Sequence, residues 1–157
     1  MDAIIFPSLY GNEPIKNSIG KDILLDTNAH AYILEGPKGS GKHLAARLIA
    51  SSLLCSNKNK SGILPCGECL SCKKIAKNLS PDLIWINSEG KATISVDIIR
   101  NVRNGLHIPP NDGDKKIYII EDADTMTLQA QNAFLLSLPI RYFLCLLLVF
   151  HIEIWYT

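Results

Sequence analysis

The feature that most constrains this chain is a glycine-rich segment lying between two apolar patterns. The segment reads Gly36-Pro37-Lys38-Gly39-Ser40-Gly41-Lys42 and fits the first seven positions of the pattern G-x-x-x-x-G-K-[ST]. The apolar run 31–34 before it predicts a buried strand, and the apolar spacing of 42–54 predicts a helix behind it. Glycines let backbone N–H groups converge on phosphate oxygens, and a helix N-terminus adds favourable potential. The segment is therefore predicted to bind phosphate, with Lys42 reaching the outer phosphates.

The eighth position of this pattern holds His43 where a Ser or Thr is usual. A hydroxyl at that place binds Mg²⁺, and an imidazole cannot replace it because Mg²⁺ prefers oxygen ligands. The other interpretation of 36–43 is a glycine-rich strand-to-helix turn with no ligand. We expect a phosphate loop whose binding of ATP and Mg²⁺ is weakened.

A second apolar run, 117–120, predicts a strand that ends in Glu121 and Asp122. In P-loop ATPases a strand-end Asp holds Mg²⁺, and a neighbouring Glu polarises the attacking water. Here the order is Glu then Asp, so each side chain differs by one methylene from the usual one. The alternative is a solvated strand end without a function. We take Glu121 and Asp122 as the catalytic candidates of an altered site.

Four cysteines follow the spacing C-x10-C-x2-C-x2-C: Cys55, Cys66, Cys69 and Cys72. Four thiolates can close a tetrahedral zinc site, which is structural because no coordination position stays open. The loop that carries them is too polar to be held by burial, so a metal would stabilise it. The alternative is four unrelated reduced thiols. Cys145 lies in an apolar segment and is interpreted as a small core residue.

The composition is that of a globular chain of one domain. Its 157 residues are 47% apolar and 20% charged, and strands alternate with helices, which predicts an α/β sandwich with a mainly parallel sheet. The net charge of +1 gives no sign of a polyanion partner. No export signal is visible at the N-terminus, and the apolar run 142–152 is too short to span a membrane. We expect a cytoplasmic protein with no membrane partner.

Together these motifs resemble the AAA+ module of bacterial clamp-loader subunits, the delta-prime and tau/gamma pair. Further stretches agree with the resemblance: Gly11-Asn12-Glu13, His30-Ala31-Tyr32, Ala123-Asp124-Thr125-Met126-Thr127 and Gln131-Asn132-Ala133. It extends from about Tyr10 to Leu138. The resemblance implies a P-loop NTPase (AAA+) three-layer sandwich over residues 1–138, with an inserted four-cysteine zinc module at about 55–72.

Of the two siblings, delta-prime resembles the chain better, because the Lys-Thr and Asp-Glu pairs usual in tau/gamma are absent. The resemblance implies a stator in DNA replication that helps ATP-driven loading of the sliding clamp onto primed DNA within DNA polymerase III. Implied partners are the delta and tau/gamma subunits, the sliding clamp and, through the complex, primer–template DNA. One alternative is an active tau/gamma-type subunit in which Lys42, Glu121 and Asp122 hydrolyse ATP. Another is a non-functional, zinc-stabilised fragment.

The last segment, 139–157, departs from the family pattern. The Ser-Arg-Cys motif that carries an arginine finger in the family is absent, and an apolar tail follows Leu138. We expect a frameshift or truncation there, leaving the sheet incomplete at its C-terminal end. Alternatively, residues 143–150 fill the place of the next strand, because a buried parallel strand needs little beyond apolar residues.

Overall fold

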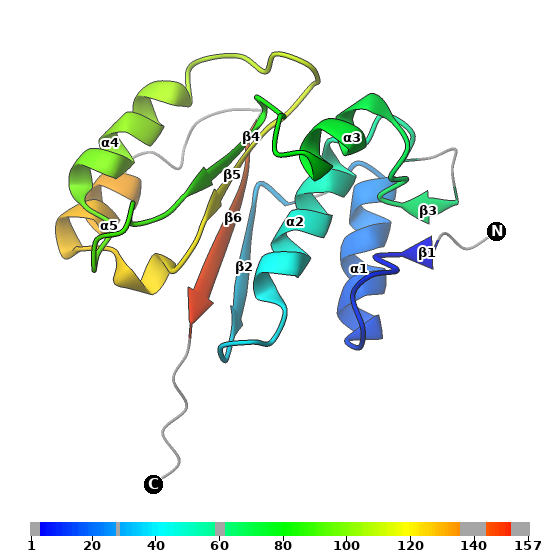
Figure 1. Ribbon diagram of the computed structural model, residues 1–157, viewed down its shortest axis with the longest axis horizontal. Helices are drawn as coiled ribbons and strands as arrows, with labels where there is room; N and C mark the ends of the chain where they lie inside the picture. The colour runs from blue at the N-terminus through cyan, green and yellow to red at the C-terminus, as the bar shows by residue number, and fades with distance from the viewer. Residues whose placement is uncertain (1–3, 28, 59–61, 136–143, 152–157) are drawn as a thin grey trace, which may run out of the picture.

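The computed structural model describes residues 4–27, 29–58, 62–135 and 144–151. Strands and helices alternate along them (Figure 1). In chain order the elements are β1 (Ile4–Ile5), α1 (Glu13–Leu24), β2 (Ala31–Gly36), α2 (Lys42–Leu53), β3 (Ile63–Leu64), α3 (Leu70–Ala76), β4 (Leu83–Ile86), α4 (Val96–Gly105), β5 (Lys116–Ile120), the 3₁₀ turn η1 (Ala123–Thr125), α5 (Leu128–Leu135) and β6 (Leu144–His151).

Four strands form one parallel sheet in the order β2-β6-β5-β4. In this register Tyr118 of β5 pairs with Ile84 of β4 on one side and with Leu146 of β6 on the other. Parallel neighbours need crossover connections, which the helices between the strands supply. In Figure 1, α1, α2 and α3 lie to one side of the sheet, whereas α4 and α5 lie to the other. The expected α/β class with a parallel sheet is confirmed.

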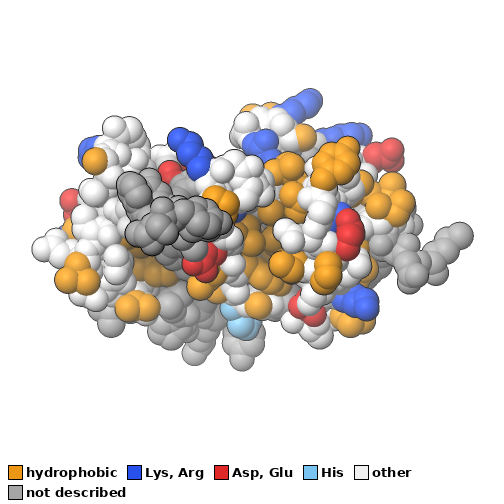
Figure 2. Space-filling model, turned by 90° about the horizontal axis from the view of Figure 1, so that it is seen from below, with side chains coloured by type: hydrophobic (Ala, Val, Ile, Leu, Met, Phe, Trp, Pro, Cys, Tyr) orange, Lys and Arg blue, Asp and Glu red, His pale blue; other side chains and the backbone are white. Residues whose placement is uncertain are grey.

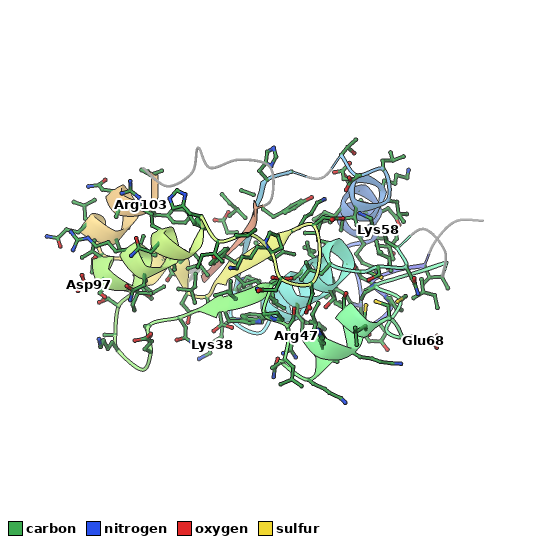
Figure 3. The ribbon with its side chains drawn as sticks, turned by 90° about the horizontal axis from the view of Figure 1, so that it is seen from above. Lys38, Arg47, Lys58, Glu68, Asp97 and Arg103 are labelled. Atoms are coloured by element: carbon green, nitrogen blue, oxygen red, sulfur yellow. The ribbon has the colours of Figure 1, made fainter. Side chains whose placement is uncertain are left out.

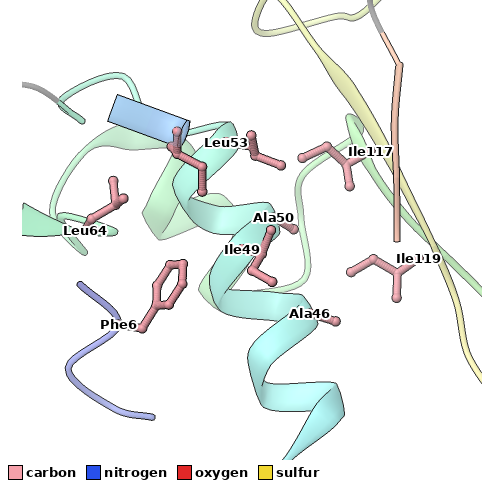
Figure 4. Packing of buried hydrophobic residues seen from close by; sticks show 9 residues of the cluster. Phe6, Ala46, Ile49, Ala50, Leu53, Leu64, Ile117 and Ile119 are labelled. Atoms are coloured by element: carbon pink, nitrogen blue, oxygen red, sulfur yellow. The ribbon is translucent and has the colours of Figure 1, made fainter. Parts of the chain in front are cut away.

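Strand β5 divides the hydrophobic core into two parts, because successive side chains of a strand point to opposite faces. Ile117 and Ile119 pack on the α2 face, and Tyr118 and Ile120 pack on the α4–α5 face. Figure 4 shows the first core, which consists of Phe6, Ile23, Ala46, Ile49, Ala50, Leu53, Leu64, Ile117 and Ile119. The second consists of Ile86, Ile94, Ile99, Tyr118, Ile120, Ala123, Met126 and Ala130.

A small parallel pair, β1 with β3, was not expected from the sequence. Ile4 pairs with Ile63, and Ile5 pairs with Leu64. The segment 56–65 reads as a polar loop, yet Leu64 within it is fully buried in the first core. A single buried leucine therefore draws this loop against the N-terminal segment.

Two threonines precede the last helix, and they have different roles. Thr125 lies in η1, where its hydroxyl donates to the carbonyl oxygen of Asp122 at 2.8 Å. Helix α5 begins at Leu128, and Thr127 Oγ1 accepts a hydrogen bond from the Ala130 N–H at 3.2 Å. Thr127, and not Thr125, thus supplies the capping oxygen of α5.

Strand β6 lies between β2 and β5, inside the sheet rather than at its edge. The change of composition expected at Leu138 falls within 136–143, which lie outside the described residues, as do residues 152–157 of the apolar tail. Among the helices described, none has the length and apolar character needed to cross a membrane.

Asp82, at the start of β4, holds the loop before β5. Its carboxylate accepts hydrogen bonds from the N–H groups of Asn111 and Asp112, both at 2.7 Å, and from the Asn111 side-chain amide at 3.3 Å. Asp82 is only 1% exposed. Burial raises the pKa of its carboxyl, but these hydrogen bonds, together with Lys116, outweigh burial and lower the pKa below its usual value.

We predict that Asp82→Asn lowers the free energy of unfolding by about 1–3 kcal/mol at neutral pH, because buried N–H groups lose a charged acceptor. The folded pKa lies below the unfolded value of about 3.9, so this stabilisation is present above about pH 4 and is lost as the pH falls through the folded pKa. Urea titrations should show the difference from wild type shrinking below about pH 4. The control Asp97→Asn, at an exposed ion pair with Arg100, should change stability by less than about 0.5 kcal/mol. A difference for Asp82→Asn that is the same at every pH would contradict this account.

Candidate nucleotide and metal sites

The predicted phosphate loop joins β2 to α2 with the side chain of Lys42 folded into it. Lys42 Nζ donates to the carbonyl oxygens of Gly36 at 2.7 Å and Pro37 at 2.6 Å, and to Ser40 Oγ at 3.3 Å. The lysine is 5% exposed. Gly41, with φ 84°, sits in the left-handed region just before the helix, where a side chain would be strained. An ammonium group therefore already lies at the centre of the loop.

This arrangement fits a phosphate group. The three oxygens around Lys42 Nζ all belong to the loop itself, so the charged group lies inside the loop that would hold the phosphate. The helix that begins at Lys42 also directs its N-terminal N–H groups toward the loop. Lys38 is exposed on the outer side of the loop and is labelled in Figure 3.

A cavity of about 430 Å³ adjoins the phosphate loop. One wall is the segment 6–19, which contributes mainly apolar side chains, and the opposite wall is formed by β2, the loop and α2. Figure 2 views the lower side of Figure 1, where the loop lies, and shows hydrophobic side chains gathered across the middle of that face. The lining residues include Phe6, Leu9, Tyr10, Ile15, Ile19, Gly36, Ser40, Gly41 and Lys42. This wall was not predicted from the sequence, because Leu9 and Tyr10 belong to no recognisable motif.

The acidic strand end lies next to the phosphate loop, as the sequence predicts. Glu121 follows β5, and its N–H donates to the Ile86 carbonyl oxygen at 2.9 Å. Its Oε1 lies 3.2 Å from His43 Nδ1 on the first turn of α2. Asp122 follows with a positive φ of 49°, which turns the chain into η1. Glu121 and the phosphate loop are thus brought together, although the contact with His43 was not predicted from the sequence.

The residues at this place do not fit the ligand set that Mg²⁺ prefers. A hard cation takes oxygen ligands in near-octahedral geometry, and His43 offers an imidazole nitrogen instead. That nitrogen is directed at Glu121 Oε1, so the imidazole also engages a carboxylate oxygen beside the loop. Lys42 and the backbone N–H groups of the loop are the groups that would hold a phosphate, and position 43 offers an imidazole in place of a hydroxyl.

Beside His43 lies a second, shallower hollow of about 450 Å³. Arg47 of α2 places its guanidinium 5.9 Å from the centre of the Trp85 ring and donates to Asn78 Oδ1. Trp85 packs against the first core and is only partly buried. Arg103 lies on α4, at the other end of the molecule from Lys58 in Figure 3.

The four predicted cysteines converge at one point. Their Sγ atoms all lie within 4.8 Å of one another, with Cys55 and Cys69 4.0 Å apart and Cys66 and Cys72 3.9 Å apart. Sulfurs at the corners of a tetrahedron with metal–sulfur distances of about 2.3 Å are about 3.8 Å apart. The four residues, which we call the cysteine cluster, are therefore close enough to hold one metal ion.

The surroundings of the cluster favour thiolate at one position. Burial raises the pKa of Cys69, but hydrogen bonds from the Cys72 N–H, at 3.4 Å, and from neighbouring groups outweigh it, so that its pKa falls to about 6. Burial raises the pKa of the Cys55 and Cys72 thiols. Because thiolates bind metals, Cys69 offers a ligand that is already deprotonated at neutral pH.

Comparison with known proteins assigns the family. The family model for the DNA polymerase III delta subunit matches residues 11–151, which include the phosphate loop, the cysteine cluster, Glu121 and strand β6. The chain belongs to this DNA polymerase III family. It is a clamp-loader subunit chain close to tau and gamma, which confirms the resemblance drawn from its motifs.

Curated relatives carry the names of three clamp-loader subunits. DNA polymerase III subunit delta-prime of Bacillus subtilis is 40% identical over 123 residues, which are 76% of this chain and 34% of the relative. Subunit tau of the same organism is 32% identical over 133 residues, 85% of this chain and 23% of the relative. Subunit gamma of Buchnera aphidicola is also 32% identical, over 85% of this chain and 36% of the relative. The chain thus spans about a quarter to a third of the length of these relatives.

A solved structure supports the fold. A DNA polymerase III gamma subunit-related protein from Thermotoga maritima superposes with a TM-score of 0.56 at 19% identity, over 85% of this chain and 39% of that one. This likeness agrees with the α/β fold of the AAA+ class.

We predict that the chain binds one divalent metal ion through the cysteine cluster, and that Cys69→Ser lowers the affinity at least about tenfold, which corresponds to about 1.4 kcal/mol. Co²⁺ is a suitable probe, because four thiolates give it a tetrahedral visible spectrum. Ser71→Ala is the matched control: its hydroxyl lies 3.2 Å from Ser56 Oγ, one residue away from Cys72, and it is not a ligand. Equal Co²⁺ affinity in wild type and Cys69→Ser would show that the four sulfurs do not act together.

Proposed function

We propose that this chain is a delta-prime-type stator of the DNA polymerase III clamp loader, with a weakened nucleotide site and a structural zinc ion. The observation that carries this proposal is His43, which replaces the Mg²⁺-binding hydroxyl and lies 3.2 Å from Glu121. In this role the chain assists ATP-driven loading of the sliding clamp onto primed DNA and contacts the delta and tau/gamma subunits. DNA is reached through the complex.

Nucleotide binding is supported by the loop and the cavity beside it. Lys42 and the N–H groups at the start of α2 would hold the phosphates, and the apolar wall formed by 6–19 would cover the base and sugar. With Glu121 next to an imidazole and no hydroxyl at position 43, these residues bind a nucleotide and orient its phosphates, but they are poorly arranged to activate water. Such a site senses or holds nucleotide more readily than it hydrolyses it.

Zinc is supported by the ligand set of the cysteine cluster. Four cysteine sulfurs and no open position are the donor set of structural zinc sites, and Zn²⁺ has no redox chemistry that would endanger the thiolates. Bound there, Zn²⁺ would stabilise the segment 55–72, which otherwise buries few side chains.

A second candidate function, an ATP-hydrolysing subunit of tau/gamma type, is favoured by a different observation. Lys42 and the glycines of the loop keep the geometry of a phosphate site, and Glu121 still places a carboxylate beside it. In that case Glu121 would orient the attacking water, and Asp122 would belong to the same acidic end.

Titration of the purified chain with ATP, with and without Mg²⁺, tests the nucleotide site. We predict that Mg²⁺ changes the wild-type affinity by less than about threefold, and that His43→Thr makes binding at least about tenfold tighter in Mg²⁺, because it restores a hydroxyl ligand. Lys42→Ala should weaken binding about 10- to 100-fold, since charge-assisted hydrogen bonds contribute about 1.5–3 kcal/mol. Strong Mg²⁺ dependence in the wild type would argue for the hydrolysing subunit instead.

Clamp loading in a reconstituted complex separates the stator from the ATPase. With a stator, Lys42→Ala should leave the loading rate within about twofold of wild type, because the other subunits supply hydrolysis. Lys38→Ala, which removes an exposed lysine from the same loop, is the control for surface charge. Loss of loading with Lys42→Ala alone would assign hydrolysis to this chain.

A further inference from the structure

The cysteine cluster and the wall of the nucleotide cavity are joined by the β1–β3 pair. Strand β3 lies between Cys55 and Cys66 in the chain, so both ends of the loop that carries it are fixed by cluster residues. Strand β1 directly precedes Phe6, the first residue of the wall. The segment that carries the cysteine cluster and the segment that forms the wall are therefore joined by the pairing of β1 with β3.

Hydrogen bonds and buried side chains both make this connection. The Ile4 N–H donates to the Gly62 carbonyl oxygen at 2.8 Å, and the Phe6 N–H donates to that of Leu64, also at 2.8 Å. Phe6 and Leu64 are 1% and 0% exposed. Figure 4 shows their side chains together on one side of α2, where they face Ile49.

From Phe6 the connection continues to the phosphate loop. The Leu9 N–H donates to the Phe6 carbonyl oxygen at 2.9 Å, and the Leu9 carbonyl oxygen accepts from Lys16 Nζ at 2.8 Å. A Cβ built on Gly41 would lie 3.7 Å from Leu9 Cδ1, so Leu9 packs directly against the loop. Leu9 is thus hydrogen-bonded to Phe6 on one side, and its side chain packs against Gly41 on the other.

Strand β3 is one of three contacts that hold the beginning of the wall: Ile5 also lies against Gly20 of α1, and Phe6 is buried in the first core. Strands β1 and β3 are two residues each, and an isolated two-stranded pair is marginal in water. The burial of Leu64 and Phe6 in the first core stabilises the pair, and Cys55 and Cys66 flank the segment of the chain that carries Leu64. A metal ion bound by the four sulfurs would reduce the conformational freedom of the segment between Cys55 and Cys66. It would thereby favour the pairing of β3 with β1.

We propose that metal binding at the cysteine cluster raises the affinity of the cavity for ATP, with Leu64 and Phe6 as the positioning residues that connect the two sites. This inference rests on the proposed nucleotide site. The metal contacts neither the nucleotide nor the phosphate loop, and it acts by fixing the apolar wall in the binding-competent position. Coupling between sites is reciprocal, so ATP must raise the affinity for the metal by the same factor.

The test measures ATP binding by calorimetry on the full chain, first loaded with Zn²⁺ and then after its removal with a chelator under reducing conditions. Far-UV circular dichroism is recorded on both forms. We expect the dissociation constant for ATP to rise about tenfold on metal removal, and the Zn²⁺ affinity measured by dye competition to rise about tenfold with ATP present. Equal ATP affinity in two folded forms would overturn the coupling and leave the proposed nucleotide site standing. No ATP binding to the Zn²⁺-loaded chain would remove both.

If the metal-free chain unfolds, a pair of variants tests the coupling between the metal site and the nucleotide site instead. Leu64→Ala and Ile99→Ala delete the same number of carbon atoms from fully buried positions, but Ile99 belongs to the second core on the α4–α5 face. In the Zn²⁺-loaded, folded state, Leu64→Ala should weaken ATP binding about tenfold and Ile99→Ala by less than about twofold. The same change in both variants would mean that Leu64 acts only through general stability, and the inference would fail.

Discussion

Burial of β5 on both faces is the constraint on which the rest of this structure depends. All five of its residues are buried. Because successive side chains point to opposite faces, Ile117 and Ile119 pack in one core, and Tyr118 and Ile120 pack in the other. Because β5 pairs with β4 on one side and β6 on the other, it cannot shift register without exposing both cores. The strand therefore fixes where Glu121 emerges, and the helix packed on its first face, α2, fixes where the phosphate loop begins.

The candidate functional residues lie at the two ends of helix α2. Lys42 and His43 lie at the start of α2 beside Glu121, and Cys55 follows the end of the same helix. The helix thus separates the loop at 36–43 from the cysteine cluster. The N-terminal segment runs alongside the helix, in contact with β3 near the cysteine cluster and with Gly41 at the other end. These two contacts are the physical basis of the proposed coupling between the two sites.

Much of this could be read from the sequence, since the relevant signals are local. The apolar runs at 31–34 and 117–120 each predicted a strand that the structure contains, and the cysteine spacing identified four residues whose sulfurs the structure brings together. The β1–β3 pair, the cavity wall and the contact between His43 and Glu121 could not be predicted, because they join residues far apart in the chain through single side chains without a motif. The start of α5 could not be predicted either, because Thr125 and Thr127 are equally suitable as caps in the sequence and only the structure places Thr125 in η1.

The central claim is that the loop at 36–43 and the wall at 6–19 together form a nucleotide site that does not need Mg²⁺. Amide chemical shifts of the ¹⁵N-labelled chain, recorded while ATP is added in the absence of Mg²⁺, test this most directly. The account predicts that the largest shifts fall on the amides of 38–43 and 9–16, with those of α4 unchanged. Shifts confined to other parts of the chain, or none at all at millimolar ATP, would contradict it.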